Sequence, residues 1–168
     1  PTAEAAGTSF TFDPENPCPT EGGGNLVLPA GPMDQRTIEA REDVLSFSSA
    51  TLTEPLEITG HAHAEIHLSS NAVDTDLSIR FCDVYPDGRS FLMAEGMLRM
   101  RFRNSFETPE LIVPGKTTAV VVRLWPTSVV INRGHQLRID VTSSNYPRFD
   151  LNPGTGMPWR DVAVAVKQ

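Results

Sequence analysis

Hydrophobic and polar residues alternate along several stretches of the chain. The longest alternation runs from Leu56 to Leu68, where apolar residues occupy every second position over most of the segment. Successive side chains of an extended strand point to opposite faces, so we expect one face of this segment in the core and the other in water. Shorter patterns predict further strands at 44–47, 77–81, 98–102 and 137–141.

Two other apolar runs and a turn signal extend this pattern. Ala119 to Leu124 is almost continuously apolar, which is typical of a more deeply buried strand, and 162–166 is expected to form a last short strand. Pro86-Asp87-Gly88 favours a tight turn, because Pro presets its φ and Gly accepts a positive φ. No stretch keeps a capped helical period beyond about two turns. We therefore predict an all-β fold, a β-sandwich of the jelly-roll type, in one domain over 1–168.

Two long stretches lack any regular period, at 13–41 and 143–159. Both are rich in Pro or Gly, yet both carry large side chains, among them Leu26, Leu28, Tyr146, Phe149 and Trp159. Loops of this length in a compact domain are either functional or disordered, and large apolar residues disfavour disorder. We expect both stretches to be ordered.

Composition narrows the classes of partner. The chain of 168 residues has a net charge of −7, which argues against binding to nucleic acid or to an anionic membrane. No apolar run approaches the roughly 20 residues that span a bilayer. Arg99, Arg101 and Arg103 alternate, but at this net charge a solvated or salt-bridged strand face is favoured over an anion site. Because the chain opens at Pro1 in a polar run, we expect it to be a piece of a longer protein.

The cysteines offer little chemistry. Cys18 and Cys82 have no metal-type spacing and can form at most one disulfide bond. Cys82 lies within an apolar strand pattern, which favours a reduced and half-buried thiol.

A histidine stripe on the Leu56–Leu68 segment is the most conspicuous metal candidate. His61, His63, Glu65 and His67 share one face of the predicted strand. The run covers roughly 20 Å, far too long for a single zinc ion with bonds near 2.1 Å, and a neighbouring strand would have to supply further ligands. A solvated or interface-facing strand side is therefore favoured over a zinc site.

Two loop features resemble ligand sites without matching their motifs. Gly22 to Gly24 could suggest a phosphate-binding loop, but the following Lys-Ser/Thr and the strand–helix context are missing, so a flexible turn is favoured. Asp74, Asp76 and Asp83 could suggest a calcium loop, but their spacing fits no EF-hand. We expect no metal and no cofactor.

Three residues could suggest a hydrolase triad. His135, Asp140 and Ser143 are close in sequence, but no G-x-S-x-G elbow occurs anywhere in the chain. Because triads are recognised by geometry, the missing motif does not by itself exclude one. The sequence favours a chain with no catalytic residues of its own.

Four motifs together closely resemble one family, the C-terminal domain of serine hydrolases of the X-Pro dipeptidyl-peptidase and cocaine-esterase type. The resemblance spans about Phe12 to Gly156. Its motifs are DP-x-x-P-x-P-T-x-G-G at 13–23, G-P-x-D-Q-R at 31–36, D-V-x-P-D-G-R at 83–89 and S-S-N-x-P-R-x-D at 143–150.

The resemblance implies a galactose-binding-like jelly roll beside an α/β-hydrolase domain, which carries the Ser-Asp-His triad, and a helical cap domain. It implies that Leu26, Val27 and Leu28 help to wall the acyl pocket, and it allows dimer contacts. We expect Asp34 and Arg36 to anchor their loop through hydrogen bonds to the backbone or to nearby charges. The resemblance also implies that a final strand of the family lies beyond this chain, leaving a sheet edge exposed.

A carbohydrate-binding module remains the alternative, because the same fold is often one and fold alone does not decide function. Sugar modules need exposed aromatic platforms. Trp125, Tyr146 and Trp159 lie beside prolines in loop-like or strand-end settings, and the family motifs favour the hydrolase interpretation.

Overall fold

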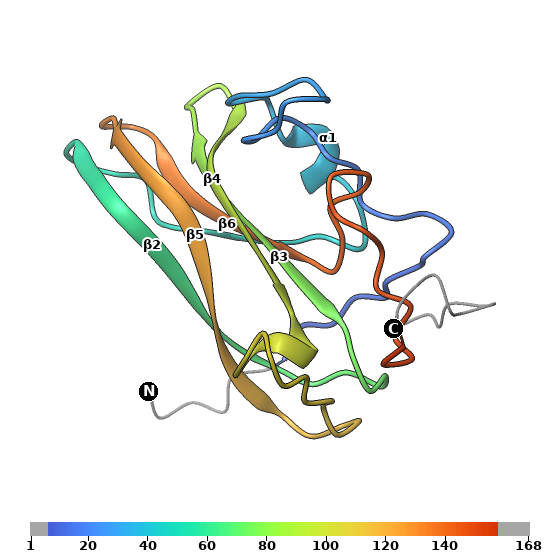
Figure 1. The fold of residues 1–168 in the computed structure, drawn as a ribbon. Helices are drawn as coiled ribbons and strands as arrows, with labels where there is room; N and C mark the ends of the chain where they lie inside the picture. Colours follow the sequence, from blue (N-terminus) through green and yellow to red (C-terminus); the bar gives the residue numbers. More distant parts are fainter. Residues whose placement is uncertain (1–6, 158–168) are drawn as a thin grey trace.

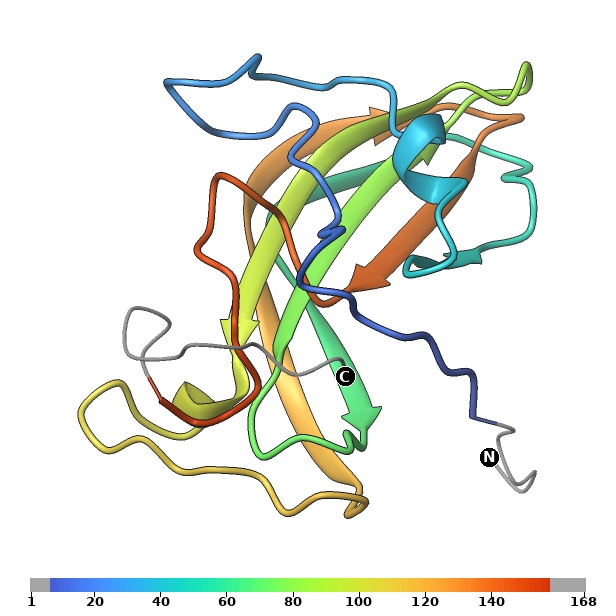
Figure 2. The same ribbon diagram turned by 90° about the vertical axis from the view of Figure 1, so that its right-hand side faces the viewer.

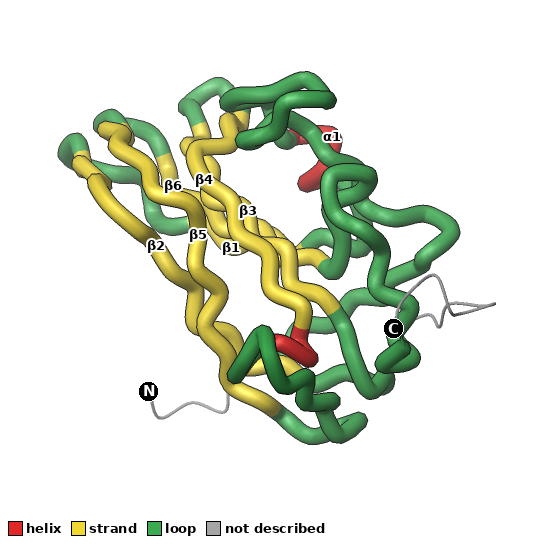
Figure 3. Tube along the Cα trace, viewed as in Figure 1, coloured by secondary structure: helices red, strands yellow, loops and turns green. Residues whose placement is uncertain are grey.

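Two antiparallel sheets form the body of the molecule (Figures 1 and 3). The computed structural model describes residues 7–157. Four strands pair in the order β1-β6-β3-β4, and β2 pairs with β5 alone. The elements are α1 (Arg36–Glu39), β1 (Leu45–Ser48), β2 (Leu56–Leu68), β3 (Asp76–Val84), β4 (Ser90–Arg99), the 3-10 turn η1 (Met100–Phe102), β5 (Thr118–Ile131) and β6 (Gln136–Thr142).

The hydrophobic core lies between the two sheets. Ile79 and Phe81 of β3 belong to the same buried cluster as Val122 and Leu124 of β5. Gly96 of β4 lies against the backbone of Arg123 in β5, so that a Cβ on this glycine would overlap the Arg123 carbonyl group. A side chain at this crossing would push the layers apart.

The strands predicted within residues 7–157 are present with changed boundaries, and the strand expected from the apolar run 119–124 extends from Thr118 to Ile131. The Leu56–Leu68 strand has the predicted alternation of exposed and half-buried residues along its length. The expected strand at 98–102 instead ends at Arg99, and Met100 to Phe102 form a 3-10 turn. The expected strand at 162–166 lies outside the described residues. Four residues of helix, Arg36–Glu39, were not anticipated.

Burial differs from the sequence pattern in two strands. Polar and apolar residues alternate in β3, yet every residue of Asp76–Val84 is buried. The apolar run of β5 indicated deep burial, yet Val121 and Arg123 are exposed and only alternate residues are covered. The reason is the layer on each side: the outer face of β2–β5 is open, whereas the outer face of the four-stranded sheet is covered.

That cover is made by α1 and the two long irregular stretches. Figure 2 shows them in front of the four-stranded sheet, with the first stretch in blue and the second in red-orange. Over residues 13–41 and 143–157 both stretches are therefore ordered layers of the fold, as predicted, and Trp159 lies outside the described residues. Over residues 7–157, no helix has the length and apolarity required to cross a membrane.

Candidate functional site

The two long stretches are hydrogen-bonded to each other where Cys18–Thr20 meets Ser144–Arg148. The Cys18 amide donates to Ser144 Oγ at 2.8 Å, and the Tyr146 amide donates to the Cys18 carbonyl at 3.0 Å. The Thr20 amide in turn donates to the Tyr146 carbonyl at 2.8 Å. Two motifs that are about 120 residues apart in the sequence thus form one structural unit.

A buried arginine of β3 contacts this unit from the sheet. Arg80 is 1% exposed, and its Nη2 donates to the Pro19 carbonyl at 3.3 Å while Nη1 lies 3.6 Å from Cys18 Sγ. Burial raises the pKa of the Cys18 thiol, although the Arg80 charge opposes this shift. Cys18 and Cys82 are both free and buried, so the disulfide that the sequence allowed is absent and Cys82 is more deeply buried than expected.

The first stretch carries a projecting loop, seen at the upper edge of the molecule in Figure 2. Gly23 and Gly31 exchange two backbone hydrogen bonds of 2.9 Å, which close its base. Asn25 organises the interior: its Nδ2 donates to the Gly22 carbonyl at 3.0 Å, and its Oδ1 accepts from the Leu28 amide at 2.7 Å. We call residues 22–33 the tip loop.

The three predicted pocket-wall residues form the apex of the tip loop. Leu26 and Val27 have relative exposures of 102% and 93%, whereas Leu28 is half-buried. Exposed single apolar residues are common, whereas two adjacent ones make a small apolar patch at the apex of this hydrogen-bonded loop.

The residues after the tip loop attach it to β4. The Ser90 amide donates to Asp34 Oδ1 at 3.3 Å, and Asp34 also pairs with Arg36 at 2.7 Å. Hydrogen bonding to Arg36 lowers the pKa of Asp34. Gln35, between Asp34 and Arg36, is fully buried. Its backbone amide donates to the Ser90 carbonyl at 2.7 Å, and its side-chain Nε2 donates to the Glu21 carbonyl at 2.9 Å. Gln35 could not be singled out from the sequence, because a polar residue in a loop carries no burial signal.

Glu95 of β4 is the buried centre of the site. It is 5% exposed and accepts three donors from distant segments. The Gly24 amide donates to Oε1 at 3.1 Å, Asn145 Nδ2 donates to Oε2 at 3.0 Å, and Arg148 Nη1 contacts Oε1 in an ion pair. Arg148 also stacks over Trp125 of β5, 4.7 Å from the ring centroid. The only signal in the sequence is a lone acid within the apolar pattern of 91–98.

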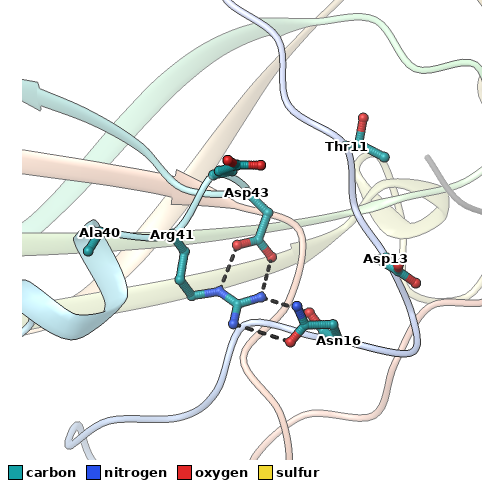
Figure 4. Close-up of a pocket in the computed structure, with 7 residues that line it drawn as sticks. Thr11, Asp13, Asn16, Ala40, Arg41 and Asp43 are labelled. Atoms are coloured by element: carbon teal, nitrogen blue, oxygen red, sulfur yellow. Dashed lines mark hydrogen bonds and ion pairs between the residues drawn. The ribbon is translucent and has the colours of Figure 1, made fainter.

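A second candidate is the pocket drawn in Figure 4, which lies between the N-terminal segment and the end of α1. The Arg41 guanidinium spans it, with Nε 2.7 Å from Asp43 Oδ1 and Nη2 2.9 Å from Asp43 Oδ2. Nη2 also donates to the Asn16 carbonyl at 2.7 Å. Through these bonds Arg41 links the N-terminal segment at Asn16 to the residues after α1. Because its charge is paired, it is poorly placed to bind an anion.

A third candidate is a cluster under α1. Among residues 7–157, Glu39, Cys82 and Asp140 are the one group of three metal-capable side chains whose ligand atoms approach within 4.8 Å. Their atoms already bond within the protein: Ser46 Oγ donates to Asp140 Oδ1 at 2.6 Å, and Cys82 Sγ lies 3.6 Å from Asp140 Oδ2. Ser90 Oγ donates to Glu39 Oε1. Burial raises the pKa of the Cys82 thiol well above its usual range, which opposes the thiolate that a metal requires.

The residues considered for a triad do not assemble as one. His135 Nδ1 lies 2.8 Å from Asp83 Oδ1, and Tyr85 packs on the imidazole with 4.3 Å between ring centroids. Asp140 instead belongs to the cluster under α1.

The arginine and aspartate candidates bind each other. Asp74 pairs with Arg101 at 2.6 Å, and Asp76 pairs with Arg99 at 2.9 Å. Both aspartates are buried, so the salt-bridged interpretation of the arginines is confirmed.

The histidine stripe lies on the open face of β2, as the alternation predicted. His61, His63, Glu65 and His67 are all exposed. His67 Nε2 lies 3.6 Å from Glu65 Oε1. Arg123 of β5 is directly opposite His63.

The family assignment rests on a match over most of the chain. The family model of the X-Pro dipeptidyl-peptidase C-terminal non-catalytic domain matches residues 3–163. The chain belongs to this family. It is therefore a non-catalytic C-terminal domain of hydrolases of the X-Pro dipeptidyl-peptidase and cocaine-esterase type, as the motifs indicated.

Relatives and solved structures agree with this assignment. The chain is 42% identical over 155 residues to a cocaine esterase of Rhodococcus sp. and 28% identical over 149 residues to a putative serine esterase of Mycobacterium tuberculosis. These matches cover 91% and 79% of this chain but only 27% and 23% of the relatives, so the chain spans about a quarter of their length.

Two solved structures share the fold. An aminopeptidase from a marine-sediment Thaumarchaeota archaeon superposes with a TM-score of 0.80 at 27% identity, covering 89% of this chain and 27% of that one. An α-amino acid ester hydrolase superposes with a TM-score of 0.73 at 32% identity, covering 76% of this chain and 22% of that one.

Proposed function

We propose that this domain packs on the α/β-hydrolase domain of its parent enzyme through the tip loop, and that Leu26, Val27 and Leu28 help to wall the acyl pocket there. The parent enzyme would be a serine hydrolase that cleaves esters, amides or peptides and also carries a cap domain. The observation that carries the proposal is the apex itself: Leu26 and Val27 are fully exposed on a loop whose backbone is held by hydrogen bonds.

The energetics support docking at this apex. Burying one Leu or Val side chain stabilises a complex by about 1.5–3 kcal/mol, and association loses part of that when flexible groups must be ordered. The tip loop is already ordered by Asn25 and by the Gly23–Gly31 pair. A pre-organised apolar apex therefore keeps most of its burial energy for binding.

The jelly-roll, galactose-binding-like arrangement is part of the proposal. It is supported by the likeness to the solved aminopeptidase and by the two antiparallel sheets that enclose the core. The anchoring roles of Asp34 and Arg36 are proposed on their bonds to each other and to Ser90. Dimer contacts through this domain stay a prediction.

The carbohydrate-module alternative has less support. Trp125 and Tyr146 are about half exposed, as a sugar platform would need. One face of the Trp125 ring, however, is occupied by Arg148, and Gly24 is packed against its edge. A stacking ligand would have to displace a guanidinium that is paired with a buried carboxylate.

Hydroxyl-radical footprinting of the full-length enzyme tests the docking. Leu26 and Val27 should be oxidised far more slowly than their exposure in this domain predicts, because the hydrolase domain covers them. Phe106, with 86% exposure on another loop, is the internal reference and should react at the rate of an exposed phenylalanine. Rapid oxidation of Leu26 and Val27 in the folded enzyme would contradict docking through the apex.

A further inference from the structure

The Glu95 carboxylate joins three segments that are far apart in the sequence. Its partners are Gly24 in the tip loop and Asn145 and Arg148 in the second long stretch. Glu95 itself lies in β4, at the edge of the four-stranded sheet. We propose that Glu95 is the positioning residue that fixes the tip loop on the sheet and so sets where its apex meets the hydrolase domain. This inference rests on the proposed function.

The chemistry of the carboxylate suits this role. Three donors point at its two oxygens, and an ionised carboxylate is an acceptor at every lone pair. A glutamine in its place would turn an NH2 group toward one of those donors. The buried position makes the bonds strong and their loss costly, because the site has little water to replace a partner.

The tip loop approaches this carboxylate through two glycines whose missing side chains are required. Gly23 has a φ of +82°, and a Cβ there would overlap the Glu95 carboxylate. A Cβ on Gly24 would overlap the Trp125 ring. Arg148 covers that ring while pairing with Glu95, so carboxylate, guanidinium and indole form one seat for the loop backbone.

The seat lies two to three residues from the apex. Gly24 is bonded to Glu95, and the next residue, Asn25, fixes the Leu28 amide. A shift of Gly24 therefore moves Leu26 and Val27 directly. A misplacement of about 1 Å in a pocket wall can reduce catalytic efficiency by up to about 100-fold, even when the changed residue is far from the reacting atoms.

The test uses the full-length enzyme with 4-nitrophenyl acetate and compares Glu95→Gln with Asp76→Asn. Asp76 is also a buried carboxylate with an arginine partner, but it pairs with Arg99, the last residue of β4. Below the melting temperature, Glu95→Gln should lower kcat/KM by about tenfold or more. Asp76→Asn should lower only the melting temperature. Hydrogen exchange should quicken at the Gly24 and Leu28 amides in Glu95→Gln alone.

Gly24→Ala provides a second route if Glu95→Gln does not fold. It pushes the loop away from Trp125 while keeping the Glu95 carboxylate itself, and it should give the same loss of kcat/KM. The inference is overturned if Glu95→Gln, or Gly24→Ala in its place, keeps kcat/KM within about twofold while Val27→Asp lowers it. If Val27→Asp also leaves kcat/KM unchanged, the proposed function fails as well.

Discussion

Arg101 and Asp74 form an ion pair that is almost completely shielded from solvent, with 2.6 Å between Nε and Oδ2. The same guanidinium donates to the carbonyl oxygens of Gly156 and Met157, at 2.7 and 3.2 Å. The pair therefore fastens the end of the second long stretch to the sheet. It shows that an arginine of the alternating stripe serves the interior of the fold.

Replacing Arg101 should destabilise the domain strongly. Arg101→Met removes the guanidinium that pairs with the buried Asp74, and breaking such a buried pair costs about 3–5 kcal/mol. The free energy of unfolding, measured by urea titration, checks this. Arg89→Met is the matched control, because Arg89 pairs with Asp87 at the surface and an exposed pair is worth about 0–1 kcal/mol. Equal losses in the two variants would contradict the structural role of the buried pair.

Asp140 should make stability fall with rising pH. Burial, together with the nearby Glu39, raises the pKa of Asp140 above its usual 3.8. The folded state therefore binds the Asp140 proton more tightly than the unfolded state does. The contribution of this proton to the free energy of unfolding is fully present below pH 3.8 and is lost as pH rises through the folded-state pKa. In Asp140→Asn this loss is absent, so the variant should gain stability relative to the wild type as pH rises from acid toward neutral.

Asp34 serves as the control, because its contribution to stability depends on pH in the opposite direction. Its pKa is lowered by the hydrogen bond to Arg36, so its contribution is present above pH 3.8 and is lost as pH falls through the lowered pKa. Relative to the wild type, Asp34→Asn should therefore lose stability as pH rises from acid. Unfolding titrations at several pH values measure both differences. Parallel curves for Asp140→Asn and the wild type would show that Asp140 is not perturbed as described.

Both cysteines should be unreactive in the folded protein. Cys18 and Cys82 are fully buried free thiols, and burial raises the pKa of each. Because the thiolate is the reactive form, 5,5′-dithiobis(2-nitrobenzoic acid) should react with neither in native buffer and with both in denaturant. Fast reaction of one thiol under native conditions would mean that the layer over the four-stranded sheet opens readily.

The strands could be predicted from the sequence, but their surroundings could not. Alternation located β2, β3 and β6 because side-chain direction is a local property of extended backbone. Whether the second face of a strand is covered depends on the layers packed against it. The polar face of β3 is buried because the long stretches lie over it, and Val121 of β5 is exposed because nothing described covers that side.

The two loop motifs of the candidate site could be recognised in the sequence, but its central residue, Glu95, could not. The motifs at 13–23 and 143–150 were recognised separately, and the structure joins them through Cys18 and Ser144. Glu95 was overlooked, because a lone acid in an apolar strand says nothing about which distant donors will meet it. Its partners are about 50 to 70 residues away in the sequence, so only the folded arrangement reveals them.

The most direct test of the account is the kinetic effect of Val27→Asp in the full-length enzyme. A charge at the apex of the tip loop would have to be desolvated against the hydrolase domain, which is costly without a partner. Val130→Asp is the matched control, because Val130 is also an exposed valine and lies on the open face of β5.

With an activated ester as substrate, the account predicts that Val27→Asp lowers kcat/KM by about tenfold or more while the domain stays folded, and that Val130→Asp changes it by less than about twofold. Wild-type kcat/KM and melting temperature in Val27→Asp would contradict the claim that this apex meets the hydrolase domain.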